Sequence, residues 1–416
     1  MAFTRTFRQL RPILAALARH KVATALIVLQ VALTLAVASN ALCIVAMRIV
    51  HMSRPTGADE AHLFVIHNGW KMGQNPTQIN ANIEADLDVL RHVAGVHDAY
   101  SSQIYPLGGY KDHVVTHLKV EPDPKAHAEL VPYLAADEHT IDTLGISLVA
   151  GRNFRADEIT AIGPNDKMAP PGIIITRGLA DTLFPDGSAL GKTVYLPDGP
   201  SAIIGILAKL QGSLRNSSHA DGHPVLVPMH FVDPRGTEYV VRSDSTDMKP
   251  VIAAALKALQ QPGGIRIIDP KVGVATMAQI RKHAYEDDRS LAMLMSIVCG
   301  LLLLATAGGI VGLSSFWVSQ RRRQIGIRRS LGATKGDILR YFHAENFLIV
   351  SGGIVLGALL AFFANIGLMQ VYELPRMPLY VPLLGALLLW LLGQLAVWGP
   401  ARYAARVPPV VAIRTE

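Results

Sequence analysis

Four long stretches without a charged residue constrain this 416-residue chain more than any other feature. No Asp, Glu, Lys or Arg occurs in residues 22–47, 290–319, 346–372 or 377–401, which are 26, 30, 27 and 25 residues long. About 20 apolar residues are enough for a helix to cross the ~30 Å hydrocarbon core of a bilayer. The pattern therefore predicts an integral membrane protein with four spanning helices.

Basic residues beside these stretches predict the orientation in the membrane. The segments before the first span, between the second and third, and after the fourth together hold 15 of the 39 Lys and Arg. Because such residues accumulate in cytoplasmic loops, we expect both termini in the cytoplasm and residues 48–289 outside. The outer segment has a net charge of −5. The overall charge of +7 therefore reflects topology and does not indicate nucleic-acid binding.

Two further features bear on how the outer segment is made. Ala36-Val37-Ala38 resembles a signal cleavage site, but the uncharged run continues to Met47, so we expect a retained first span. Cys43 and Cys299 both fall within predicted spans, and no cysteine lies in the outer segment. We therefore expect the outer segment to be stabilised by an ordinary core and not by disulfides.

The predicted organisation has ten parts. They are a cytoplasmic N-terminal segment (1–21), the first span (22–49), an extracytoplasmic domain (50–274), a stalk helix (275–289), the second span (290–319), a cytoplasmic coupling loop (320–342), the third span (343–372), a short outer loop (373–376), the fourth span (377–401) and a cytoplasmic tail (402–416).

Alternating and helical patterns predict an α+β fold for the outer domain. A strand at 62–67, a helix from Pro76 and a strand at 96–107 form one β-α-β unit. The order repeats near the far end, with a strand at 239–241, a helix at 250–259 and a strand at 265–268. The stretch between them, about 125–235, is rich in Gly, Pro and short strand patterns. The fold class is therefore a four-helix transmembrane domain with a split β-α-β subdomain that carries a mostly β insertion.

The stalk follows this domain directly. Residues 275–289 have a helical pattern, and no Gly or Pro separates them from the second span. We expect a rigid helix that could carry motion between the two compartments, with Met277, Ile280, His283 and Glu286 as its characteristic residues.

Several sequence features resemble nucleotide or metal sites, but none has the spacing that such a site needs. Residues 187–193, GSALGKT, look like a phosphate-binding loop, yet three residues separate the glycines where the motif needs four. We interpret this segment as a tight turn that leads into a strand. The outer segment contains 13 of the 15 histidines, but no closed ligand spacing accompanies them, so we expect no metal site. We also expect no catalytic residues, because no nucleophile motif occurs.

Two glycine pairs in the spans permit close helix packing, Gly308 with Gly312 and Gly353 with Gly357. Packing within one subunit and contact with a second copy are both compatible with this spacing.

The cytoplasmic loop mixes basic and apolar residues. Ile325, Ile327 and Leu331 lie among arginines, and the spacing of Thr334 and Asp337 predicts a capping box at the start of a helix. One interpretation is an amphipathic segment bound to lipid headgroups. The other is a short docking helix for a cytoplasmic protein.

These residues carry a family resemblance. Residues 323–334, RQIGIRRSLGAT, resemble the signature loop of MacB/FtsX-like ABC-transporter permeases, usually R-E-I-G-I-R-x-A-L-G-A. Residues 400–414 are similar to the terminal motif of that family, and 144–154, 180–184 and 190–192 are similar to its periplasmic core domain. One departure is Gln324, where the family commonly has Glu, which puts a charged contact there in doubt.

The resemblance implies a mechanotransmitting permease of the bacterial inner membrane. It implies a partner ATPase that binds ATP and Mg²⁺, so that this chain binds no cofactor and is not itself an enzyme. Only 21 residues precede the first span, and we expect the ATPase to be a separate chain. Other implied partners are a second permease copy or a paralogue, a periplasmic adaptor with an outer-membrane channel, and membrane lipids. The implied ATPase-coupling residues are Arg323, Gln324, Ile325, Gly326, Arg328, Leu331, Gly332, Ala333 and Asp337.

Three functions remain open at this point. We favour efflux of a peptide, antibiotic or amphiphile, because the large outer domain fits the MacB-like branch. Extraction of lipids or lipoproteins uses the same architecture. A non-transport role, as in FtsX-type regulators of cell-wall hydrolases, is the third alternative.

Overall fold

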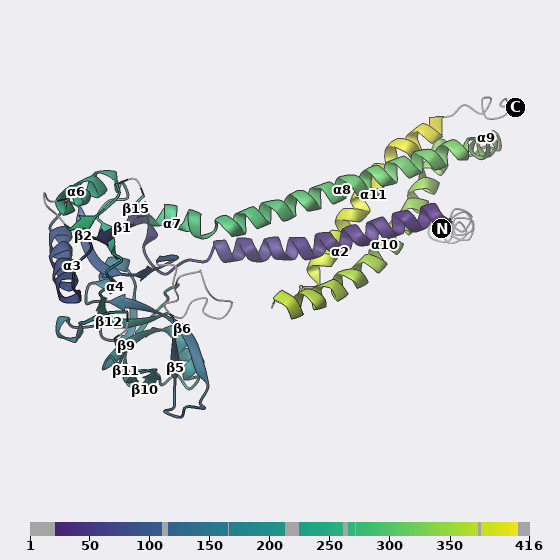
Figure 1. Cartoon of the computed structure of the whole chain (residues 1–416). Helices are drawn as coiled ribbons and strands as arrows, with labels where there is room; N and C mark the ends of the chain where they lie inside the picture. Colours follow the sequence, from purple (N-terminus) through teal and green to yellow (C-terminus); the bar gives the residue numbers. More distant parts are fainter. Residues whose placement is uncertain are drawn as a thin grey trace. The chain divides into compact units, whose positions relative to one another are not determined.

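The computed structural model describes residues 21–109, 115–164, 166–212, 224–260, 265–270, 272–372 and 376–406 (Figure 1). The chain divides into two compact units. The described residues within Met1–Ser53 and Asp287–Glu416 form a helical unit, and those within Arg54–Glu286 form an α/β unit. Each unit has its own hydrophobic core.

Four long helices make up most of the helical unit. They are α2 (Lys21–Met52), α8 (Glu286–Gln320), α10 (Lys335–Tyr372) and α11 (Tyr380–Arg406). Each is long and apolar enough to cross a membrane, which confirms the four predicted spans. Two of the four helices extend past both ends of their uncharged stretches, and all four continue into polar flanking residues. A fifth, short helix, α9 (Arg322–Ser330), lies between α8 and α10.

Glycine allows α10 to pack closely on α2. A Cβ atom on Gly353 would lie 2.6 Å from the Cβ of Val31, and one on Gly357 would lie 2.8 Å from the carbonyl oxygen of Ala32. By contrast, a Cβ on Gly308 or Gly312 of α8 would meet nothing within 4 Å. The two glycine pairs are alike in sequence, but within this chain the pair on α10 makes the close contact.

Polar side chains connect the helices at several depths. The Thr34 and Thr306 hydroxyls join α2 to α8 at 2.7 Å. The amide of Gln30 donates to the carbonyl oxygen of Ala305, also on α8. Asn40 of α2 donates to the carbonyl oxygen of Ala361 on α10, at 3.2 Å. These bonds satisfy groups that would be costly to leave unpaired in hydrocarbon.

The α/β unit begins and ends with the predicted split β-α-β arrangement. Its elements are η1 (Glu60–His62), β1 (Leu63–Trp70), α3 (Pro76–Arg91), β2 (Val96–Ser102), β13 (Thr237–Ser243), α6 (Lys249–Leu259), β14 (Arg266–Ile267) and β15 (Val274–Thr276). The strand order is β14-β1-β13-β2, with β15 also paired to β1. The apolar sides of α3 and α6 pack on this sheet, with Ile79, Ile83 and Leu87 buried at helical spacing.

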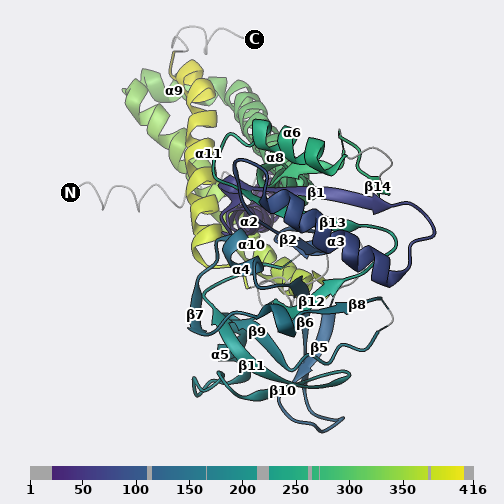
Figure 2. The ribbon, with the colours of Figure 1, turned by 90° about the vertical axis from the view of Figure 1, so that its left-hand side faces the viewer.

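The predicted β insertion lies between β2 and β13 and forms a closed barrel (Figure 2). The main sheet runs β10-β5-β6-β12-β9-β11, and β10 also pairs with β11, so the six strands close on themselves. Its elements are β3 (Ile104–Tyr105), β4 (Gly108–Gly109), β5 (Val115–Lys119), β6 (Ala128–Ala136), α4 (Thr140–Leu144), β7 (Leu148–Gly151), η2 (Ala156–Glu158), β8 (Thr160–Ile162), β9 (Gly172–Thr176), α5 (Arg177–Leu183), β10 (Thr193–Leu196), β11 (Gly199–Leu207) and β12 (Val225–Phe231). Closure was not predicted from the sequence.

The segment that resembles a phosphate loop is a turn before a strand, as the sequence analysis interpreted it. Gly187 and Gly191 have φ values of +77° and +80°, which favour glycine. Lys192 donates to Asp186, and its amine lies 4.7 Å from the centre of the Phe184 ring. This lysine is therefore used within the turn.

Candidate functional site

The short helix α9 is joined to α8 by a single residue. Arg321 has φ −96° and ψ 9°, and it separates α8 from α9. Its amide donates to the carbonyl oxygen of Trp317, and its own carbonyl oxygen accepts from the amide of Ile325. Because backbone bonds of helical spacing continue on both sides, the two helices are joined without a flexible linker.

An ion pair fixes this joint inside the helical unit. One guanidinium nitrogen of Arg321 lies 3.0 Å from both carboxylate oxygens of Glu345, on α10. The side chains are 12% and 2% exposed, respectively. Removing either partner would leave a buried charge, which typically costs about 3–5 kcal/mol. This pair was not predicted from the sequence, although a lone acid directly before the uncharged run 346–372 was a visible signal.

One side of α9 is buried against the helical unit. Ile325 is 6% exposed and packs in a cluster with Val318, Ile338, Phe342, Ala401, Ala404 and Ala405. Gly326 is buried beside it. Both were predicted as coupling residues, but Ile325 faces its own chain and offers little surface to a partner. Periodicity in the sequence could not show which apolar residue of the loop faces inward.

The other side of α9 is exposed. Ile327 and Arg328 lie three and four residues after Gln324, and Leu331 lies four and three residues after them, which places all four on one face of the helix. Ile327 is 46% exposed and Leu331 is 82% exposed. Ile327 was not in the predicted set. The guanidinium of Arg328 lies 5.0 Å from the Tyr341 ring, which holds this cation beside the two apolar side chains.

Two capping motifs define the turn that follows α9. Gly332 has φ +97°, and its amide donates to the carbonyl oxygen of Arg329, while the amide of Ala333 donates to that of Arg328. This is the Schellman pattern, for which glycine is favoured. Thr334 and Asp337 then form the predicted capping box, with hydroxyl to carboxylate at 2.6 Å and backbone bonds in both directions. The predicted residues Arg323, Leu331, Gly332 and Asp337 are exposed.

The predicted stalk helix is interrupted. Helix α7 (Met277–Ala284) ends at Tyr285, and α8 starts at Glu286. Met277 and Ile280 are buried in the α/β unit, whereas His283 and Glu286 are exposed and lie 3.3 Å apart. The prediction of a single uninterrupted helix over 275–289 was therefore wrong. The reason is tertiary, because the Tyr285 ring is buried and its hydroxyl is 3.5 Å from the Gln211 amide.

Hydrogen bonds tie α7 to the segment where the chain enters the α/β unit. Arg281 donates two bonds to the carboxylate of Glu60 and one to the carbonyl oxygen of Arg54. The Thr56 hydroxyl donates to the same carboxylate at 2.6 Å. Burial opposes ionisation of Glu60, but the bonds from Arg281 and Thr56 keep its pKa below the ordinary value. The two ends of the α/β unit are thereby held together.

The helical unit contains a matching tie. Arg48 near the end of α2 lies 2.6 Å from the carboxylate of Asp288 near the start of α8, and His51 lies 3.1 Å from the other oxygen. The Asp288 side chain is 13% exposed. In each unit, a carboxylate therefore joins the segment by which the chain enters the unit to the segment by which it leaves.

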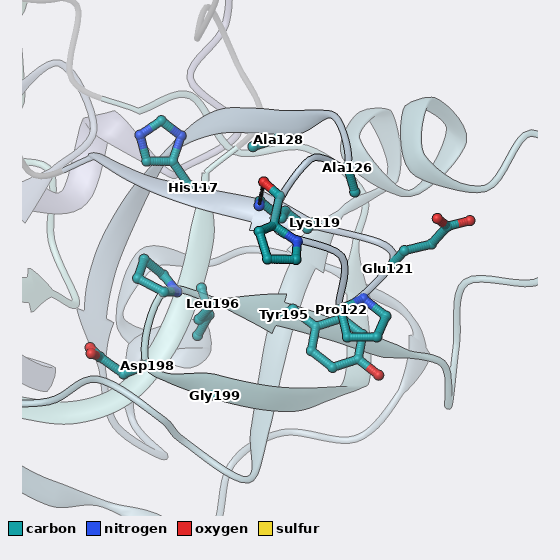
Figure 3. Close-up of a pocket in the computed structure, with 12 residues that line it drawn as sticks. His117, Lys119, Glu121, Pro122, Ala126, Ala128, Tyr195, Leu196, Asp198 and Gly199 are labelled. Atoms are coloured by element: carbon teal, nitrogen blue, oxygen red, sulfur yellow. Dashed lines mark hydrogen bonds between the residues drawn. The ribbon is translucent and has the colours of Figure 1, made fainter.

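A hollow of about 660 Å³ opens in the insertion between the turns after β5 and β10 (Figure 3). His117, Lys119, Glu121 and Tyr195 are among its lining residues. It lies beside the junction of β5 and β10, where Tyr195 pairs with Lys119, the one pair between these two strands among the residues that the structure describes. The amine of Lys119 donates to the carbonyl oxygen of Pro124 at 2.8 Å. Within the described residues, no group of three or more His, Cys, Asp or Glu could hold a metal ion.

Comparisons with known proteins cover both units. Residues 24–259 match the family described as MacB-like periplasmic core domain, and residues 296–409 match the family described as FtsX-like permease C-terminal. The macrolide export ATP-binding/permease protein MacB of Chromobacterium violaceum is 24% identical over 278 residues, which cover 65% of this chain and 41% of that protein. The chain thus spans about two fifths of that relative.

Two further comparisons give a permease and a solved structure. The uncharacterized ABC transporter permease YvrN of Bacillus subtilis is 25% identical, with 67% of this chain and 69% of that protein covered. Among solved structures, the periplasmic region of MacB from Actinobacillus actinomycetemcomitans is 15% identical, covers 56% of this chain and 97% of its own, and has a TM-score of 0.34.

Proposed function

Because the chain belongs to the family of ABC-transporter permeases that have a MacB-like periplasmic core domain and an FtsX-like permease domain, we propose that it is the membrane subunit of an exporter driven by a separate ATPase. In this proposal the chain lies in the bacterial inner membrane with both termini in the cytoplasm. It binds no nucleotide itself. ATP and Mg²⁺ bind to the partner.

The observation that carries the proposal is the division of α9 into an anchored side and an exposed side. Ile325 and the pair Arg321–Glu345 fix the helix to α8, α10 and α11. Ile327 and Leu331 remain exposed among cations. Burial of a leucine or isoleucine side chain contributes about 1.5–3 kcal/mol, and the surrounding arginines would orient an acidic partner. A helix with these properties is suited to bind an ATPase and to follow its movement.

Movement of α9 would reach the rest of the helical unit through these fixed contacts. The α8 helix continues from Gln320 back to Glu286, where the α/β unit begins. The ties at Asp288 and Glu60 would make the two chain crossings move as a pair. We propose that ATP binding favours one arrangement of the α/β unit over another, which is the energetic requirement for mechanotransmission.

The proposed substrates are a peptide, an antibiotic or another amphiphile. One relative is described as a macrolide export protein, which supports this class. The proposed partners are the ATPase, a second permease copy or a paralogue, and a periplasmic adaptor with an outer-membrane channel. Two alternatives remain: extraction of lipids or lipoproteins, and regulation of a cell-wall hydrolase. A measurement of export, described below, distinguishes them from efflux.

The docking step is tested by co-purification of the chain with its ABC ATPase. Leu331→Asp with Ile327→Asp should reduce ATPase retention and stimulation by about tenfold to a hundredfold, because a central apolar contact contributes about 1.5–3 kcal/mol. Leu130→Asp, which changes an exposed side chain on β6 of the α/β unit, is the matched control and should have no effect. Equal retention by the double variant and the control would contradict docking on α9.

The transmission step needs a separate experiment. Two glycines inserted after His283 should abolish export or resistance while ATPase retention stays normal. The insertion breaks α7 one residue before its end and leaves α9 unchanged. Normal export by this variant would show that force does not pass through α7. Normal export with altered cell separation would instead favour the hydrolase-regulator alternative.

A further inference from the structure

Two arginines at one end of the helical unit lie over aromatic rings. The guanidinium carbon of Arg402 is 3.9 Å from the centre of the Trp398 ring, and that of Arg322 is 5.3 Å from the Tyr403 ring. Arg322 also donates a hydrogen bond to the Tyr403 hydroxyl. All four side chains are exposed. The rings therefore hold two cations in place at the surface.

The exposed side of α11 changes character toward its C-terminal end. Leu391, Leu395, Trp398 and Arg402 follow at intervals of three and four residues and so lie on one face. Leu391 is 56% exposed and Leu395 is 71% exposed. Trp and Tyr concentrate where the hydrocarbon core meets the headgroups. The order of apolar, aromatic and cationic side chains therefore matches the order of acyl chain, interface and phosphate in a lipid.

No carboxylate neutralises these arginines within the described residues. In 290–372 and 376–406 the acids are Asp337 and Glu345. Asp337 caps the start of α10, and Glu345 binds Arg321. Arg406, four residues after Arg402 on the same face, is likewise without an acidic partner among the residues that the structure describes.

We propose that Arg322, Arg402 and Arg406 bind the phosphate of an anionic phospholipid, with its acyl chains along Leu391 and Leu395. A guanidinium that stacks on a ring through its face keeps N–H groups at its edge, and these suit a phosphate in a bidentate arrangement. The apolar stripe beside the cations selects a lipid over a soluble phosphate. These arginines can bind a lipid whichever ATPase is the partner.

The site also has a consequence for the proposed docking helix. Arg322 is the first residue of α9. A phosphate bound to Arg322 and Arg402 would connect the start of α9 to the end of α11 and limit its tilt. The exposed face with Gln324, Ile327 and Leu331 is a different set of residues and stays available to a protein. The activity of the assembled transporter should therefore change with the fraction of anionic lipid.

Native mass spectrometry of the full chain in neutral detergent tests the site. Added phosphatidylglycerol should be retained in preference to phosphatidylcholine with the same acyl chains. Arg322→Gln with Arg402→Gln should reduce the apparent affinity for phosphatidylglycerol by about fivefold for each arginine removed. Arg322→Lys with Arg402→Lys should lose less, because the charges remain while the stacked, bidentate geometry is lost. The thermal unfolding midpoint of each variant identifies any that fail to fold.

The matched control is Arg323→Gln with Arg340→Gln, which removes two exposed cations that contact no ring or acid in the described part of the chain. The control should keep its lipid preference. An equal loss in the control and the test variant would show a diffuse basic surface and overturn the site. Displacement of the lipid by glycerol phosphate would indicate a soluble ligand and also overturn it. Loss of ATPase retention in Arg322→Gln with Arg402→Gln, with lipid binding unchanged, would assign the arginines to the protein partner.

Discussion

Replacing one glycine in each of two similar pairs tests the packing of the helical unit. Gly353 lies where α10 crosses α2, and the new Cβ of Gly353→Ala would be 2.6 Å from the Cβ of Val31 and 3.0 Å from the carbonyl oxygen of Val28. Gly312→Ala would place its Cβ in open space, with nothing within 4 Å. The two substitutions are identical in chemistry and differ in surroundings.

The expected difference follows from these distances. Carbon atoms normally approach to about 3.5–4.0 Å, so the Gly353→Ala variant must move α2 and α10 apart by roughly 1 Å. Overpacking of this kind typically costs about 1–3 kcal/mol. Both variants gain up to about 1 kcal/mol of helix propensity, and this gain cancels when the two are compared. We therefore expect Gly353→Ala to be less stable than Gly312→Ala by about 1–3 kcal/mol.

Unfolding in sodium dodecyl sulfate, followed by circular dichroism of the detergent-purified chain, measures the difference in free energy. Equal stability of the two variants within about 0.5 kcal/mol would refute the close contact between α2 and α10. A larger loss for Gly312→Ala, seen with two assembled copies and absent from the single chain, would instead assign the α8 glycines to a subunit interface.

Three further substitutions test the candidate site and its supports. Glu345→Ala should destabilise the helical unit by about 3–5 kcal/mol in the same assay, because Arg321 then stays buried without its acid, and adding Arg321→Met should restore most of the loss. Gly332→Ala should cost about 1 kcal/mol because its φ is +97°, and faster amide exchange at Leu331–Thr334 would report it, whereas Gly336→Ala should be neutral. Since the pKa of Glu60 is lowered in the folded state, its contribution to stability is full above the unfolded pKa of about 4.5 and falls as the pH drops through the folded pKa; Glu60→Gln should remove this pH dependence of thermal unfolding.

Local signals predicted much of the fold. The four spans follow from uncharged length alone, and the strands and helices of the split subdomain follow from alternation and from apolar spacing such as Ile79 to Ile83. The turn before β10 and the capping box at Thr334 and Asp337 follow from residue type at a fixed spacing. Each of these features depends on residues that are close together in the sequence.

The features that sequence reasoning missed depend on distant residues. The break at Tyr285 arises because its ring is buried beside Gln211, a residue 74 positions away. The inward side of α9 is decided by Ile338, Phe342 and Ala404, which lie on two other helices. In the described residues, the closed barrel depends on β10 pairing with both β11 and β5, and β5 is about 75 residues away in sequence. Periodicity identifies an apolar residue but does not identify its neighbour, so Ile325 was expected to face a partner and is instead buried.

The amide side chains in the spans form hydrogen bonds between helices. These bonds bear on whether the helices move as connected bodies or open a path for a solute. Gln30 and Asn40 each donate to the backbone of another helix, and Asn365 accepts from the amide of Met377 before α11. These bonds are used for assembly, and a hydrophilic path for a solute would have to break them in an apolar medium at a cost of about 1–2 kcal/mol each. Movement of α2, α8 and α10 as connected bodies keeps the bonds intact. A mechanism in which the helical unit transmits displacement to the α/β unit is therefore less costly than one in which a substrate passes between the helices.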